Sequence, residues 1–310
     1  KLLKEHYTFK FSPATIRNIL SKLESYNLLT HIYTSSGRTP TNQGYRYYVD
    51  KFDSKLSSHL IQVYKNHFKA LESLSSNVDL LMESTATLLS RITKLFGLVM
   101  ISGNEKSILI NIELINISSD RILVILALES GLIKNIVLNL KCEIKKKDIN
   151  KITELLNEKL LGLTLNEINE SIKGRLRESD IYHHEIVQIL IEHPSINETK
   201  VEKPTIYTSH FHELLKQPEF QEASVIRKTL EALDSEQFQS CFSSFNDDKG
   251  ITLIGDEHEF DLMDHCSIVS SPFKGEQLMG QLAIVGPTRI PYHKIKNTLN
   301  YLAEVISCVC

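Results

Sequence analysis

Apolar residues near the start of the chain recur at the spacing of a helix. The dipeptide Ser12-Pro13 is a helix-start signal, because serine can cap free backbone N–H groups and proline suits the first helical position. Apolar side chains then follow an i, i+3, i+4, i+7 order at Ile16, Ile19, Leu20 and Leu23. The pattern predicts an amphipathic helix over residues 13–25.

The face of this helix opposite the apolar stripe is small, polar and free of acids. It carries Ala14, Asn18, Ser21 and Ser25, with Arg17 on its flank. Small side chains let a helix approach the floor of a DNA major groove, where arginine and asparagine can make paired hydrogen bonds to guanine and adenine. The alternative is an ordinary amphipathic surface helix, although such helices usually mix Glu and Lys on their outer face.

The residues after this helix predict two short strands. Residues 28–33 indicate a strand, residues 34–41 a turn-rich loop with Arg38 at its tip, and residues 44–49 a returning strand. Helix, strand, loop and strand is the order of a winged helix. The hydroxyls and Arg38 of such a loop could contact phosphate or the minor groove.

The rest of the chain mixes helical and strand patterns, which predicts an α+β protein of several domains. Helical stripes occur at 56–74 and 78–95, and a buried strand is expected at 97–101. Period-two alternation indicates an antiparallel three-stranded meander at 108–117, 121–129 and 133–140. We expect helices at 147–160, 165–172, 182–192 and 222–233, strands at 206–209, 250–254, 265–271 and 281–285, and a last helix from Pro287.

Composition narrows the class of protein. The 310 residues are 42% hydrophobic and 24% charged, which excludes a collagen or a mostly disordered chain. No apolar run is long enough to span a membrane, and five scattered cysteines suit a reducing compartment, so we expect a cytoplasmic protein with no membrane partner.

The net charge of −3 hides an uneven distribution. Residues 1–50 contain seven Lys or Arg against three acids, a net +4, so the remaining residues carry −7. A basic head on an acidic body suits a polyanion such as DNA. A chance excess of cations on a solvated face is the alternative.

Two separated motifs are more specific. The first comprises Ser-Pro-Ala-Thr-Ile-Arg-Asn (12–18), Leu23-Glu24, Thr-Ser-Ser-Gly-Arg-Thr-Pro-Thr (34–41) and Gly-Tyr-Arg-Tyr-Tyr-Val-Asp (44–50). The second is Gly-Gln-Leu-Ala-Ile-Val-Gly-Pro-Thr-Arg (280–289), followed by Tyr292. In this order they resemble the HrcA family of bacterial heat-inducible transcription repressors, and the likeness spans nearly the whole chain.

The resemblance implies three domains. A winged-helix DNA-binding domain would occupy residues 1–52. Family members carry a further helix and a Pro-Val-Gly-Ser segment before this region, so we expect the first helix of the domain to be missing here. A linker helix and a GAF-like α+β domain would occupy 53–104 and 198–310. An inserted dimerisation domain, with the three-stranded sheet and its helices, would occupy 105–197.

The resemblance also implies a function. The protein would bind, as a homodimer, a double-stranded inverted-repeat operator upstream of chaperone operons, and heat shock would relieve repression. A chaperonin would help keep the repressor active. The candidate DNA contacts are Arg17 and Asn18 for base edges, Ser12, Ala14, Thr15 and Ser21 for closer contacts, Lys22 for phosphate, and Ser36, Arg38 and Arg46 in the wing.

Signals for other functions are weaker. His183-His184-Glu185 and His210-Phe211-His212-Glu213 lack a matching pair at zinc spacing, so surface histidines explain them. No nucleophile–base pair or phosphate loop is present, and we expect no enzyme activity, cofactor or metal. Gly286–Arg289 could hold an anion or simply cap the last helix. The alternative function is a winged-helix regulator that senses a small ligand in a GAF-like pocket.

Overall fold

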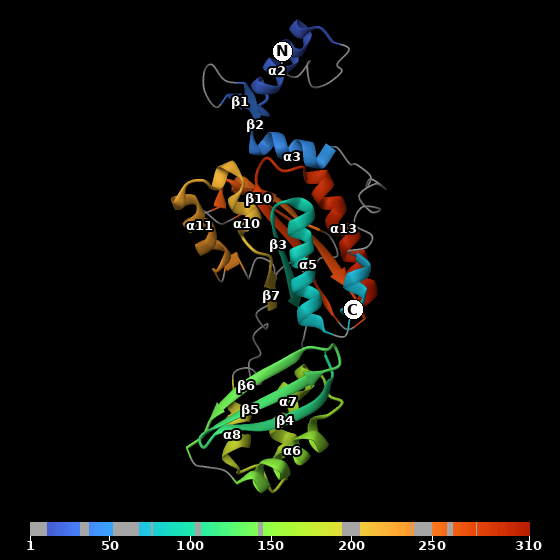
Figure 1. Ribbon diagram of the computed structural model, residues 1–310, viewed down its shortest axis with the longest axis vertical. Coiled ribbons are helices and arrows are strands. Elements are labelled where there is room, and N and C mark those ends of the chain that lie inside the picture. The colour runs from blue at the N-terminus through green and yellow to red at the C-terminus, as the bar shows by residue number, and fades with distance from the viewer. Residues whose placement is uncertain are drawn as a thin grey trace.

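The computed structural model describes residues 11–31, 37–51, 68–75, 77–102, 107–141, 145–193, 205–235, 237–238, 250–258, 263–276 and 278–310. The described strands form sheets of two, five and three strands. Figure 1 shows these sheets in succession along the long axis, with the two-stranded sheet at the N-terminal end and the five-stranded sheet in the middle.

The five-stranded sheet combines strands from distant parts of the sequence. Its order is β7-β3-β10-β9-β8, and all neighbours are antiparallel. Gly280 lets the central strand approach β3, because a Cβ there would stand 1.9 Å from the carbonyl oxygen of Met100. The strands are β3 (Phe96–Ser102), β7 (Thr205–Thr208), β8 (Thr252–Ile254), β9 (Cys266–Lys274) and β10 (Met279–Pro287).

Helices cover both faces of this sheet. The α5 helix (Val78–Thr93) and α13 (Tyr292–Val309) pack on one face, and α10 (His212–Leu215), the 3-10 turn η2 (Pro218–Phe220) and α11 (Ala223–Leu233) on the other (Figure 1). Successive side chains of β3 alternate between the two cores: Val99 and Ile101 join the first, whereas Leu98 and Met100 join the second. A strand buried on both faces is apolar throughout, as the run at 97–101 predicted.

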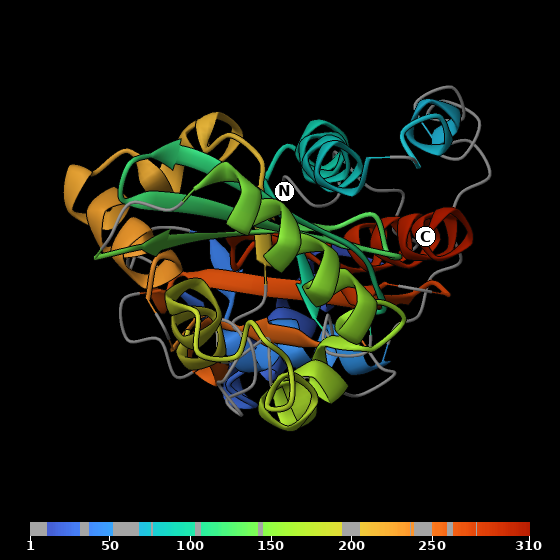
Figure 2. The ribbon, with the colours of Figure 1, turned by 90° about the horizontal axis from the view of Figure 1, so that it is seen from below.

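The predicted three-stranded meander is confirmed. It consists of β4 (Leu109–Ser118), β5 (Arg121–Leu128) and β6 (Ile133–Asn139), in that order. One face buries alternate residues of β5 against three helices, which lie in front of the sheet in the view of Figure 2. These helices are α6 (Lys146–Leu160), α7 (Leu165–Leu176) and α8 (Glu185–Glu192). The chain leaves the five-stranded sheet after β3 and returns at β7, the neighbour of β3, so the three-stranded unit is an excursion between adjacent strands.

The N-terminal part contains α2 (Pro13–Ser25), β1 (Leu29–His31), β2 (Arg38–Pro40) and α3 (Asn42–Lys51). The predicted strand at 44–49 is wrong, because these residues lie within α3, and the returning strand is β2, inside the predicted loop. Thr41 starts the helix: its hydroxyl accepts a hydrogen bond from the N–H of Gly44 at 3.0 Å. Arg46 and Asp50, one turn apart, add an ion pair at 3.4 Å.

Other departures concern boundaries. The last helix begins at Tyr292 rather than at Pro287. Of the predicted stripe at 56–74, residues 56–67 lie outside the described residues, and helix is present from Phe68. Among the helices that the structure describes, none is both long and apolar enough to cross a membrane.

The side chain of Asn157 in α6 hydrogen-bonds to the backbone of β4 at the edge of the three-stranded sheet. Its side-chain oxygen accepts from the N–H of Ile112 at 2.9 Å, and its nitrogen donates to the carbonyl of Ile112 at 2.8 Å. The amide thus takes the place of a neighbouring strand for one residue of an edge that would otherwise present unpaired backbone groups.

We therefore predict that Asn157→Leu destabilises the three-stranded unit by about 1–3 kcal/mol, because both backbone groups of Ile112 lose their partner in a partly buried place. Urea unfolding measures the loss, and amide exchange at Ile112 reports it locally. Asn166→Leu is the control, since that exposed side chain makes a single hydrogen bond within the described residues, to Glu170 at 3.4 Å. Equal stability and exchange in the two variants would show that the edge contact contributes nothing.

Candidate nucleic-acid interface

The α2 helix begins as the sequence predicts. The hydroxyl oxygen of Ser12 accepts from the N–H of Thr15 at 3.1 Å, and Pro13 occupies the first turn. The two hydroxyls of Ser12 and Thr15 also lie 2.8 Å apart in a hydrogen bond. These two predicted contact residues therefore form the capped, positive end of the helix dipole.

The outer face of α2 is open to solvent. Arg17, Asn18 and Lys22 are exposed, and within the described part of the chain none of the three side chains has a hydrogen-bond or ion-pair partner. Ala14 and Ser21 lie on the same face and are also exposed. No residue of α2, which is described throughout, is fully buried.

The single acid of α2 holds the helix against the two-stranded sheet. Glu24 binds Arg38 through Nε at 2.9 Å and His31 through Nε2 at 3.2 Å. These two partners stand opposite each other in the β1–β2 register. Glu24 thereby faces the sheet, and its charge is offset by Arg38 instead of opposing an approaching phosphate.

Arg38 does not occupy the loop tip that the sequence suggested. It lies on β2, and besides Glu24 it donates through Nη2 to the hydroxyl of Ser21 at 3.1 Å. Its guanidinium therefore connects β2 to α2. Ser36 and the rest of the predicted tip, residues 32–36, lie outside the described residues.

Arg46 lies on α3, not on a wing strand, and points to the body of the protein. Its guanidinium forms a two-pronged pair with Glu257 and donates to the carbonyl of Thr252 at 2.5 Å. The contact with Glu257 raises the pKa of Arg46. We therefore leave Arg46 out of the candidate DNA contacts, because its donors are already engaged.

Sequence reasoning missed two features of this region. Glu24 was part of a motif but received no role, although an acid on an otherwise basic helix indicates an internal partner. The α3 helix was read as a strand, although Thr41 as a cap and Arg46 with Asp50 one turn later are helix signals.

Candidate sites elsewhere have structural partners. No group of three or more His, Cys, Asp or Glu side chains that could hold a metal occurs among the described residues. His184 caps α8, where its Nδ1 accepts from the N–H of Ile186 at 3.4 Å. Arg289 of the Gly286–Arg289 segment forms a two-pronged ion pair with Glu219, so its guanidinium is already neutralised and is a poor candidate for binding an anion.

Cys266 is buried at the start of β9, close to Thr229. Burial raises its pKa to about 12, so the sulfur stays protonated at neutral pH and is a poor nucleophile. The surrounding core between the sheet and α10–α11 is filled by large side chains, including Phe96, Phe220 and Phe238. The alternative function, sensing a small ligand in a GAF-like pocket, stays a prediction.

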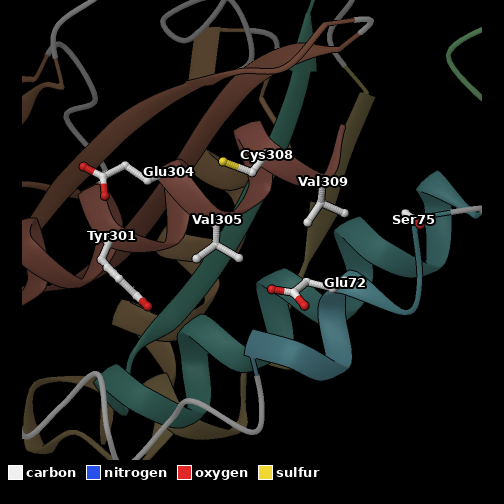
Figure 3. A pocket seen from close by; sticks show the side chains of 7 residues that line it. All are labelled: Glu72, Ser75, Tyr301, Glu304, Val305, Cys308 and Val309. Atoms are coloured by element: carbon white, nitrogen blue, oxygen red, sulfur yellow. The ribbon is translucent and has the colours of Figure 1, made fainter.

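An open groove lies between α13 and the segment 68–75 (Figure 3). Its volume is about 470 Å³. Its described lining contains two carboxylates and no cation, which does not suit DNA or another anion. The lining residues are Glu72, Ser75, Tyr301, Glu304, Val305, Cys308 and Val309.

Comparison with known proteins gives consistent results. The family model described as the HrcA protein C-terminal domain matches residues 79–295. Relatives named heat-inducible transcription repressor HrcA include those of Clostridium acetobutylicum, 30% identical over 99% of this chain and 90% of the relative, and Chlorobium chlorochromatii, 29% identical over 99% and 89%.

A solved crystal structure, described only as a hypothetical protein, superposes with a TM-score of 0.61 at 21% identity, over 99% of this chain and 91% of that chain. This likeness shows a shared fold. The family model and a relative 30% identical across nearly the whole chain show more: the protein belongs to the HrcA family, whose members are named heat-inducible transcription repressors.

Proposed function

We propose that this protein represses transcription of heat-shock chaperone operons by binding an inverted-repeat DNA operator as a homodimer. The outer face of α2 carries the proposal. Arg17, Asn18 and Lys22 are solvent-exposed there without a partner in the described chain, and the carboxylate of Glu24 is paired with Arg38. The names of the relatives support the same function.

In this proposal the N-terminal part is a winged helix. The α2 helix enters the major groove, and β1 and β2 form the base of the wing. Arg17 and Asn18 read base edges, since both can make bidentate hydrogen bonds, while Ala14 allows close approach and Lys22 contacts a phosphate. Ser12, Thr15 and Ser21 contribute shorter contacts. Arg38 acts indirectly, by holding β2 to α2.

We assign the five-stranded sheet with its two helical layers to a GAF-like domain, over 53–104 and 198–310. The three-stranded unit, within 105–197, is the proposed dimerisation domain. The return of the chain beside β3 supports this division, because the excursion leaves the five-stranded sheet continuous.

The outer face of the three-stranded sheet supports dimerisation. Opposite the helices, Ile115, Leu123 and Val137 form one row across the three strands, since Leu123 is in register with both of the others. Ile115 is 39% exposed and Val137 47%, and Ile133 on the same face reaches 59%. An apolar sheet face of this kind marks an interface, and a second copy would present the same strands to it.

The proposed response to heat follows from the uneven burial of the molecule. Neither α2 nor α3, both described throughout, contains a fully buried residue, whereas α5 alone contains nine. The DNA-reading part, from α2 to α3, therefore has little apolar stabilisation of its own. We propose that heat disorders this part first and that a chaperonin restores it.

We predict that Arg17→Ala lowers operator affinity by about 1–3 kcal/mol, roughly 10- to 100-fold, and relaxes base preference at the contacted position. Lys22→Ala should instead weaken binding to all sequences alike and reduce its salt dependence. Salt-titrated anisotropy with an inverted repeat from a chaperone operon and a scrambled duplex makes the comparison. If Arg17→Ala weakens both duplexes equally, α2 is not the base reader.

We predict that Val137→Glu raises the dimer dissociation constant by at least about tenfold, equivalent to roughly 1.4 kcal/mol, because two-fold symmetry places two carboxylates in an apolar interface. Sedimentation velocity measures the change. Leu161→Glu is the matched control, since Leu161 is 42% exposed and directly follows α6, a helix that packs on the opposite, buried face of the sheet. Identical dissociation constants for the two variants would place the interface elsewhere.

We predict that brief heating of the purified protein abolishes operator binding, and that added chaperonin with ATP restores it. The reason is the sparse burial of α2 and α3. Anisotropy with the same duplex before heating, after cooling and after chaperonin treatment follows the cycle. Full affinity after cooling without chaperonin would contradict this part of the proposal.

A further inference from the structure

The two sequence motifs of the chain meet in space, although more than two hundred positions of sequence separate them. Figure 1 shows α3 lying across the end of the five-stranded part, beside the start of α13. The Tyr45 ring of α3 packs against the Tyr292 ring of α13, with centroids 5.7 Å apart and planes inclined at 51°. Tyr45 and Val49 both pack on the main core, which is the core that contains α5 and α13. One face of α3 therefore contacts the body, the part of the protein built on the five-stranded sheet.

Polar contacts fix α3 in this position. Arg46 donates through Nε to Glu257 at 2.7 Å and through Nη2 to the carbonyl of Thr252 at 2.5 Å. One turn earlier in α3, Asn42 donates to the carboxylate of Asp256 at 2.8 Å. The acids belong to η3 (Gly255–Glu257), so two side chains of α3 engage one short segment of the body.

The body side of this contact is itself held in place. Glu257 accepts a hydrogen bond from the N–H of Ile254 at 2.9 Å, which orients its carboxylate. The hydroxyl of Tyr292 donates to the carbonyl of Thr288 at 2.6 Å and is hydrogen-bonded to Ser267 of β9 at 2.7 Å. Glu257 and Tyr292, the two body residues that Arg46 and Tyr45 contact, are therefore both anchored to the five-stranded sheet.

The α3 helix is equally well tied to the DNA-reading part. The hydroxyl of Thr41, which caps α3, donates to the carbonyl of Asn27 in the turn after α2 at 2.7 Å. Gly44 approaches Leu28 so closely that a Cβ would stand 2.1 Å from the Leu28 carbonyl oxygen. A side chain at position 44 would push α3 away from β1, so glycine is needed for this contact.

A lone surface ion pair would contribute little to position or stability. The contact of α3 differs in three respects. The Arg46–Glu257 pair is two-pronged, the guanidinium also binds a backbone carbonyl, and the aromatic pairs Tyr45–Tyr292 and Tyr48–His293 flank it, the latter at 4.6 Å. Together these directional contacts fix the orientation of α3 relative to the five-stranded sheet.

We infer that this joint, formed by α3 with η3 and the start of α13, sets the direction in which α2 leaves the body, and that Tyr45 and Arg46 are positioning residues for operator recognition. The inference rests on the proposed function. In a two-fold dimer the placement of each reading helix determines the half-site spacing that the protein accepts. The joint would therefore select operator spacing without touching a base.

The test compares Arg46→Gln and Tyr45→Ala with matched controls on the same helix. Lys51→Gln removes an exposed cation, and Tyr47→Ala removes a ring that is 50% exposed. The probes are an inverted repeat from a chaperone operon, the same repeat with its spacer altered by about two base pairs, and a duplex with a single half-site.

We expect the joint variants to bind the single half-site within about twofold of wild type and to lose affinity for the intact repeat. The penalty for altering the spacer should shrink by at least about fivefold, because freely oriented heads tolerate both spacings. The controls should keep the wild-type penalty. An unchanged spacing penalty in both joint variants would overturn the inference.

Hydrogen exchange provides a readout that does not depend on DNA. Amides of α3 should exchange at least about tenfold faster in Arg46→Gln, with β9 and β10 unchanged, which also shows that the body is folded. Tyr45→Phe, which keeps the ring, should restore wild-type exchange and spacing. If wild-type protein binds neither repeat nor half-site, the proposed function fails, while unchanged α3 exchange in both variants would reject the joint itself.

Discussion

The backbone pairing of β10 with β3 on one side and β9 on the other joins segments from three distant parts of the sequence. Gly280 permits the close approach to β3, and the pairing divides the interior into two cores that both depend on it. The three-stranded unit begins where β3 ends, and α13 begins soon after β10. The positions of the proposed dimer surface and of the α3 contact are therefore both determined by one set of strand pairs.

The N-terminal part depends on this sheet more than the sheet depends on it. Its α3 helix contributes Tyr45 and Val49 to the main core, while α2 contributes no buried residue to any core. Charged and polar contacts such as Glu24 with Arg38 determine its geometry, and each is worth little alone because it is partly solvated. With this organisation, the proposed DNA-reading part can lose order while the five-stranded sheet stays folded.

Local sequence patterns predicted the helices and strands whose burial pattern can be read directly from the spacing of their apolar residues. The strands at 109–139 were found because one face is buried and the other is not, which produces strict alternation. Residues 44–49 were misread because tyrosine and valine favour strands in general. Here the Thr41 cap and contact with the body favour a helix, and only the second of these needs tertiary structure.

The candidate site was only partly predictable for a similar reason. The exposed face of α2 follows from periodicity, so the exposure of Arg17, Asn18 and Lys22 could be predicted. Arg38 and Arg46 are equally basic in the sequence, but their acidic partners, Glu24 and Glu257, lie 14 and 211 positions away. Charge counting cannot distinguish a free cation from a paired one, and in this protein that distinction separates proposed DNA contacts from internal ones. Strand order in the five-stranded sheet was likewise beyond local pattern, and the family resemblance implied only that residues 53–104 and 198–310 form one domain.

Dimeric recognition amplifies any loss of order at the α3 joint. In the proposed dimer, both DNA-binding parts must be correctly oriented at the same time. If each is correctly oriented with probability f, the fraction of dimers that can bind the operator is f squared. A fall in f from about 0.9 to about 0.3 weakens the apparent affinity roughly ninefold for the dimer but only threefold for a single head. A contact built from partly exposed polar groups and two aromatic pairs can undergo this change without unfolding the five-stranded sheet. In the proposed dimer, two-fold symmetry thus turns a modest change in the ordering of the α3 joint into a larger change in repression. Because α2 and α3 bury little apolar surface, heating should shift this ordering equilibrium before it unfolds the rest of the protein.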